Sequence, residues 1–153
     1  MQRKYVYVAV TIAYAGFIFY LSSLSSPPNP FSPGLFMKLH RMLMDLGIEF
    51  LAYPFYFAYR YPDKFAHMLL YMGFGFALNP AVRNTLGKNP EIVSLALGTM
   101  YGASDEFHQS FVPYRSPSMG DLLADFIGLL LSQIVIIGVM RFRARRGRSK
   151  VIS

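Results

Sequence analysis

Four apolar stretches, each long enough to cross a lipid bilayer, constrain this chain more than any other feature. They lie at about residues 5–24, 63–82, 91–112 and 119–141. About 20 apolar residues in an α-helix cross a hydrocarbon core of ~30 Å, and the helix satisfies its own backbone hydrogen bonds there. More than half of the 153 residues are hydrophobic, so little chain remains for a second domain. The sequence therefore predicts a single all-α integral membrane domain over residues 1–153, with four transmembrane helices in a compact bundle.

The first stretch ends at Ser25, Ser26, Pro27 and Pro28, where two prolines lack the amide donor that a helix needs. A cleaved signal peptide is the alternative, but its apolar core is normally about 7–15 residues, which is shorter than this stretch.

In the connection that follows, residues 36–50 carry charges at three- and four-residue intervals. This pattern predicts an amphipathic interfacial helix between spans one and two. The aromatic residues within 53–61 suit the headgroup boundary better than a ligand-stacking cage.

The charges predict the orientation. The N-terminus, the 83–88 loop and the basic tail at 141–153 hold ten of the fifteen Lys and Arg residues, with Glu91 as their only acid. The opposite side holds five basic and seven acidic residues. The positive-inside rule therefore places both termini in the cytoplasm. We interpret the tail as a topology anchor at anionic headgroups rather than an RNA-binding tail, and we expect no nucleic-acid partner.

Ionisable residues gather at the predicted outer ends of spans two, three and four. Helical spacing places them on one stripe per span, each shared with small residues or a tyrosine. The stripes are Asp63, His67 and Tyr71; Gly98, Gly102, Asp105 and Gln109; and Asp121, Asp125, Gly128 and Ser132. Such groups are costly at membrane depth unless they face a bundle interior or a wet cavity. We therefore predict that the three stripes meet in a polar pocket that opens outward and tapers into a tightly packed inner half, helped by close packing at Gly120, Ala124 and Gly128.

These residues resemble the VanZ-like membrane proteins. The resemblance covers about residues 22–132 and rests on Asp63-Lys64-Phe65-Ala66-His67 with Tyr71, Asp105-Glu106-Phe107-His108-Gln109, Pro113-Tyr114-Arg115-Ser116, and Asp121 with Gly128 in register. The family pattern usually has Asn where this chain has Asp125, and Gly where it has Tyr114. The resemblance implies a multi-pass protein of the bacterial cytoplasmic membrane. The family takes its name from a member linked to low-level resistance to teicoplanin, a lipid-tailed glycopeptide, and implies no settled reaction.

Five carboxylates in this region outnumber two cations, so packing them together requires ion pairs, protonation or a bound cation. The first interpretation is purely structural: Lys64 and Arg115 pair with Asp121 and with Asp105 or Glu106. The second, which we prefer among the functions, is a binding site for the phosphate or headgroup of an envelope lipid, or for a lipoglycopeptide, held by Lys64, Arg115 and Ser116. The predicted ligand-binding residues are Asp63, Lys64, His67, Tyr71, Asp105, Glu106, Gln109, Arg115, Ser116, Asp121 and Asp125.

The third interpretation is an enzyme that acts on a phospholipid, polyprenyl-phosphate or glycan precursor at the outer leaflet. His67, Glu106 and Asp105 are its candidate catalytic residues, and Asp63, His67 and Glu106 are candidate ligands for a divalent cation. The chain has no cysteine, so a metal would need oxygen or imidazole ligands. A proton-coupled transporter draws on the same acids, but spans one and two lack ionisable groups in their inner halves.

Overall fold

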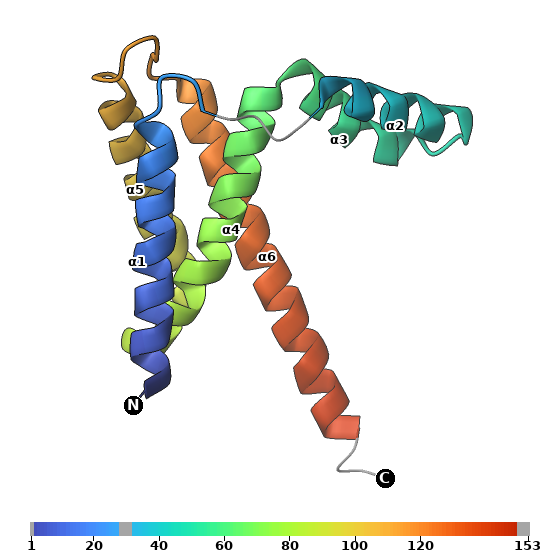
Figure 1. Cartoon of the computed structure of the whole chain (residues 1–153). Helices are drawn as coiled ribbons and strands as arrows, with labels where there is room; N and C mark the ends of the chain where they lie inside the picture. The colour runs from blue at the N-terminus through green and yellow to red at the C-terminus, as the bar shows by residue number, and fades with distance from the viewer. Residues whose placement is uncertain (1, 28–31, 150–153) are drawn as a thin grey trace.

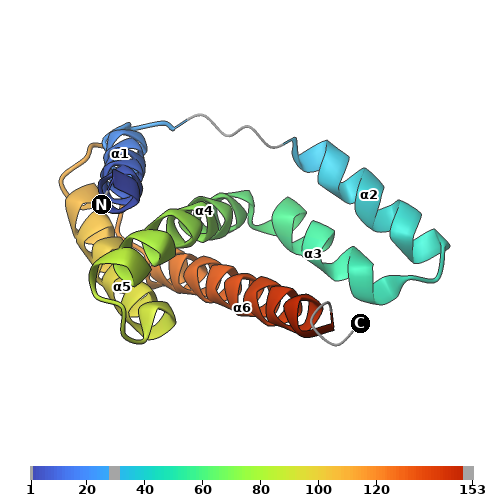
Figure 2. The same ribbon diagram turned by 90° about the horizontal axis from the view of Figure 1, so that it is seen from below.

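The computed structural model describes residues 2–27 and 32–149, and its regular elements are all α-helices (Figure 1). They are α1 (Gln2–Ser22), α2 (Pro33–Asp45), α3 (Glu49–Arg60), α4 (Pro62–Thr85), α5 (Pro90–Gln109) and α6 (Met119–Ser149). Helices α1, α4, α5 and the first half of α6 form a bundle, and α2 and α3 form a hairpin that extends sideways from one end of it (Figures 1 and 2). The all-α prediction is confirmed.

By length and composition, three helices of the described chain can cross a membrane: α1, α4 and the Met119–Arg146 part of α6. Helix α5 occupies the place of the predicted third span, but its uncharged stretch covers only residues 92–104, because Glu91, Asp105 and Glu106 all fall within the helix. Four helices pack in the bundle, but only three of the described helices have the apolar character of a span, so the predicted count of four spans is not confirmed.

The connection between spans one and two contains two helices, so the prediction of one helix over residues 36–50 is wrong at its C-terminal end. Helix α2 ends at Asp45, and Gly47 turns the chain with a φ of 71° before α3 begins at Glu49. Glycine adopts this left-handed conformation without the steric cost that a Cβ atom brings, and it commonly ends helices for that reason. The aromatic segment that follows is helical and forms most of α3.

Helix α6 is longer than the predicted fourth span, because it continues through the first part of the basic tail to Ser149. Its 31 residues correspond to ~46 Å at ~1.5 Å per residue, which exceeds a hydrocarbon core of ~30 Å. In Figure 1 the second half of α6 diverges from the other bundle helices. Residues 150–153 of the predicted tail, and Pro28 of the predicted helix stop, lie outside the described residues.

The predicted close packing of α6 is confirmed at Gly128. A Cβ atom at this position would lie 2.1 Å from the backbone oxygen of Met68, so α4 and α6 touch backbone to backbone. A Cβ atom at Gly102 of α5 would lie 3.2 Å from Oδ2 of Asp125, and Ala124 is also buried. Small residues thus bring α4, α5 and α6 together at the level of the predicted polar stripes.

The other end of the bundle is packed, but it is more polar than the sequence indicates. The Asn79 amide donates a 2.7 Å hydrogen bond to Oε1 of Gln133, and both side chains are buried. Arg83 reaches the Asn79 oxygen and forms an ion pair with Glu91. These contacts tie α4, α5 and α6 together at this end of the bundle.

Candidate ligand cavity and buried polar cluster

A cavity of about 590 Å³ lies between α1, α4 and α5. Its walls are mostly apolar and include Phe17, Ile18 and Leu21 of α1 and Leu69 and Leu70 of α4. Its polar lining consists of Ser22, Asp63, His67, Asp105, Gln109 and Arg115. This volume falls within the range of small-molecule sites, which are typically apolar with a few polar groups that fix orientation.

Arg115 is the one Lys or Arg among the residues that line this cavity. Its backbone N–H donates a 3.1 Å hydrogen bond to the Val112 oxygen, which places it in the turn after α5. None of the ion pairs between described residues involves its guanidinium, so the predicted pairing of Arg115 with Asp105 or Glu106 does not form. A guanidinium has five donors in a planar fork, and these are therefore free to bind anionic oxygens.

Lys64 has a different role, because two carboxylates hold it. Its Nζ lies 2.6 Å from Oδ1 of Asp121 and 2.9 Å from Oδ2 of Asp63. The Asp121 contact joins the first turns of α4 and α6, as the structural interpretation predicts. Lys64 does not line the cavity, and its charge is balanced locally, so it is poorly suited to hold a ligand phosphate.

His67, Glu106 and Asp125 form a second feature, which we call the buried polar cluster. They come from α4, α5 and α6, and one ligand atom from each lies within 4.8 Å of the other two. His67 Nδ1 lies 3.0 Å from Oδ1 of Asp125, and Oε2 of Glu106 accepts a 2.7 Å hydrogen bond from the backbone N–H of Ser118. The second oxygens, Glu106 Oε1 and Asp125 Oδ2, are buried and find no hydrogen-bond partner among the described residues.

Three further predicted residues surround this cluster. Tyr71 is fully buried one turn after His67 on α4, and its hydroxyl is unpartnered within the described chain, but it does not line the cavity whose floor it was predicted to form. Gln109 Nε2 donates a 3.1 Å hydrogen bond to Oδ2 of Asp105, and both residues are buried. The buried Asp105 and Gln109 line the cavity, so the cluster and the cavity share one polar wall.

Two predicted residues lie apart from the others. The side chain of Asp63 is 62% exposed and pairs with Lys64, so it borders the cavity but stands outside the group that contains His67 and Glu106. Ser116 is exposed and does not line the cavity.

Sequence reasoning missed Ser22, a buried cavity residue whose hydroxyl has no partner among the described residues, because it fell within the first apolar stretch and was given no polar role. Its position four residues after the buried Ile18, on the same face of α1, is the signal that could have found it.

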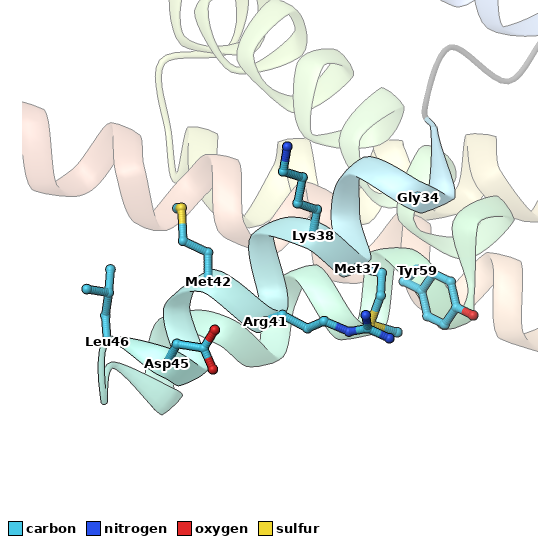
Figure 3. A pocket seen from close by; sticks show the side chains of 8 residues that line it. All are labelled: Gly34, Met37, Lys38, Arg41, Met42, Asp45, Leu46 and Tyr59. Atoms are coloured by element: carbon cyan, nitrogen blue, oxygen red, sulfur yellow. The ribbon is translucent and has the colours of Figure 1, made fainter.

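A larger hollow of about 770 Å³ lies on the α2–α3 hairpin, away from these groups (Figure 3). Lys38 and Met42 extend in one direction from α2, and Arg41 reaches toward Met37 and Tyr59 (Figure 3). It is lined by exposed or half-buried side chains rather than by buried polar groups, so it offers little to orient a ligand. The cavity between α1, α4 and α5 is therefore the better candidate site.

Comparison with known proteins supports the sequence interpretation. A protein-family model described as VanZ/LLP1 matches residues 8–141, which include all six helices in whole or in part. No curated protein and no solved structure shows a significant match.

Proposed function

This chain belongs to the VanZ/LLP1 family and is a VanZ-like membrane protein, and from that premise we propose that it binds the headgroup of an envelope lipid or a lipid-tailed glycopeptide in the cavity between α1, α4 and α5. The protein would lie in the bacterial cytoplasmic membrane with both termini in the cytoplasm and the cavity at the outer leaflet. By retaining or excluding such a ligand it would contribute to teicoplanin tolerance.

The observation that carries this proposal is the division of the cavity lining into two kinds of surface. Aliphatic and aromatic side chains of α1 and α4 suit a hydrocarbon chain, whereas Asp105, Gln109 and Arg115 offer an acceptor, an amide and a cation for a headgroup. A ligand with both an apolar chain and a polar group satisfies both surfaces. A fully polar ligand would leave the apolar wall in contact with water, and a fully apolar one would leave the buried polar groups unsatisfied.

Arg115 is the residue on which the proposal depends most. Its guanidinium is not neutralised by a described carboxylate, and a planar fork of donors matches two oxygens of a phosphate or carboxylate. Lys64, by contrast, is engaged by Asp63 and Asp121, so we assign it a positioning role at the α4–α6 contact.

The experiment is native mass spectrometry of the gently solubilised protein, with wild type beside Arg115→Ala. We expect a phosphate- or carboxylate-bearing lipid to be retained by wild type and lost from Arg115→Ala, because the variant removes the cation of the cavity. Arg60→Ala is the matched control, since Arg60 lies at the end of α3 and does not line the cavity. Teicoplanin tolerance of cells that produce each variant provides a second readout. If Arg115→Ala keeps both the lipid and the tolerance of wild type, lipid binding at this cavity is wrong.

One observation favours an enzyme as the second candidate. His67 lines the cavity, and its ring is oriented by the 3.0 Å contact with Asp125, an arrangement that suits an imidazole in proton transfer. The substrate would be a phospholipid, polyprenyl phosphate or glycan precursor at the outer leaflet. Turnover of a labelled envelope lipid by the purified protein, abolished in His67→Ala, would support this activity. Retention of the lipid without turnover would instead support binding without catalysis.

A further inference from the structure

We propose that the buried polar cluster of His67, Glu106 and Asp125 binds a divalent transition-metal ion, of the class of Zn²⁺ or Mn²⁺. This goes beyond the proposed lipid binding, which requires no metal. It also differs from the ligand set expected from the sequence, because the third ligand is Asp125 of α6 rather than Asp63.

Three side chains that are distant in sequence converge at one point. Their ligand atoms lie within 4.8 Å of one another, although they come from α4, α5 and α6. Three ligands at ~2.1 Å from one ion lie ~3.4 Å apart in tetrahedral geometry, so side-chain movements of about 1 Å complete the coordination. The helices that carry them are fixed close to the site, since α4 contacts α6 backbone to backbone at Gly128 and α5 contacts Asp125 at Gly102.

The unsatisfied oxygens provide an independent reason to place a cation here. Asp125 is fully buried and Glu106 is 6% exposed, yet Asp125 Oδ2 and Glu106 Oε1 find no partner among the described residues. Oδ2 of Asp125 faces α5 at Gly102, one helical turn before Glu106. A buried carboxylate oxygen without a partner is costly, and an ion held between these two residues would satisfy both at once.

The donor set indicates the class of metal. One imidazole with two carboxylates suits Zn²⁺, Mn²⁺ or Fe²⁺, whereas Ca²⁺ and Mg²⁺ prefer oxygen ligands alone. The hydrogen bond from the Ser118 N–H holds one oxygen of Glu106 and leaves the other for the ion, as outer-shell contacts commonly do in metal sites. Three protein ligands leave further coordination positions open, and His67 also lines the cavity, so the ion would lie in the cavity wall.

The test measures metal binding by the full-length protein in detergent after treatment with a chelator. We expect wild type to bind one Zn²⁺ per chain in competition with a chromophoric chelator, and to give an altered Mn²⁺ spectrum by electron paramagnetic resonance. Glu106→Gln and Asp125→Asn keep the side-chain shape but remove a charged ligand, so we expect each to lose about tenfold or more in affinity. Glu91→Gln and Asp45→Asn are matched controls, because both acids lie outside the cluster.

Thermal unfolding of each variant without metal checks that it is folded, and Zn²⁺ should raise the unfolding midpoint of wild type more than that of either cluster variant. Absence of saturable binding by wild type would overturn the proposal, as would equal affinity in folded Glu106→Gln and Asp125→Asn. Arg115→Ala separates this inference from the proposed function: we expect it to bind Zn²⁺ as wild type does, whether or not it loses lipid.

Discussion

Tyr114, in the loop between α5 and α6, adopts a left-handed backbone conformation with a φ of 63°. A non-glycine residue pays a steric cost there, of roughly 1–2 kcal/mol, because its Cβ approaches the backbone. The Tyr114 side chain is 98% exposed and therefore recovers little of this cost through packing. The VanZ-like pattern usually has Gly at this position, which matches the conformation of the loop.

We expect Tyr114→Gly to raise the free energy of unfolding by about 0.5–1 kcal/mol, because relief of the Cβ contact outweighs the extra freedom of glycine in the unfolded chain. Thermal unfolding of the detergent-solubilised protein measures the change. Tyr114→Ala is the control, since it removes the ring but keeps the Cβ, and it should match wild type. Equal stabilisation by both substitutions would assign the effect to the ring rather than to the backbone.

Residue spacing predicted which faces are buried but not which residues meet. Gly98, Gly102, Asp105 and Gln109 are all buried on one face of α5, as the spacing indicates. The spacing also placed Asp63 beside His67. In the structure Asp63 lies in the first turn of α4, where its side chain pairs with Lys64 and faces solvent. The partner of His67 comes from α6, and that pairing depends on the relative register of two helices, which periodicity within one helix does not contain.

At the scale of elements, the contact between α4 and α6 determines how closely the ligand-bearing helices approach. Gly128 provides this contact, because a Cβ there would lie 2.1 Å from the Met68 oxygen and 2.9 Å from the Met72 nitrogen. Backbone atoms cannot rotate aside as a side chain does, so any larger residue must separate the two helices.

Gly128→Ala should therefore lower the free energy of unfolding by about 1–3 kcal/mol, the usual cost of overpacking. Gly138→Ala is the matched control on the same helix, because no atom lies within 4 Å of its Cβ position. Thermal unfolding of both variants should show a clear loss for Gly128→Ala and none for Gly138→Ala. A similar midpoint for the two variants would mean that α4 and α6 separate at little cost.

The α2–α3 hairpin presents a largely apolar surface, with Phe50 83% and Tyr53 62% exposed. The chain has no tryptophan, so Phe50→Trp gives a single fluorescent probe at this surface. In bilayers with brominated lipids, we expect stronger quenching by bromine near the headgroup than by bromine near the chain end, as for an interfacial helix. Val10→Trp, in the middle of α1, should show the reverse order. Strong quenching of Phe50→Trp by deep bromine would place the hairpin inside the hydrocarbon core.

The hairpin also shows where element prediction fails. The amphipathic period of residues 36–50 correctly indicated helical structure after span one, but periodicity does not register a break shorter than one turn. Gly47 ends α2 through its backbone conformation rather than through hydropathy, and the chain then re-enters a helix at Glu49. A glycine flanked by two helical patterns was the available signal.

For the whole molecule, both described ends of the chain lie at the same end of the bundle, and the hairpin and the α5–α6 loop lie at the other (Figure 1). This arrangement agrees with the charge distribution, which gathers basic residues at the N-terminus, the 83–88 loop and the tail. The position of α5 determines the topology, because α5 alone separates Lys88 from Tyr114 and is the one described bundle helix that is not a candidate span.

The chain has no cysteine, so Lys88→Cys and Tyr114→Cys each provide one site for a membrane-impermeant maleimide. If α5 crosses the membrane, Tyr114→Cys should be labelled in intact cells and Lys88→Cys only after permeabilisation. Both residues are exposed, so unequal labelling reports on sidedness rather than on burial. Labelling of both sites in intact cells, or of neither, would show that α5 does not cross.

Tyr61 is the single residue between α3 and α4. Its N–H donates a hydrogen bond to the Phe57 oxygen at 2.8 Å, and its oxygen accepts one from the Phe65 N–H at 3.0 Å, so the two helices meet without a flexible loop. The α3–α4 junction is therefore held by backbone hydrogen bonds on both sides of Tyr61, and the hairpin is attached to the bundle through it. Tyr61 thereby joins the end of the hairpin directly to the first turn of α4, where Asp63 borders the cavity.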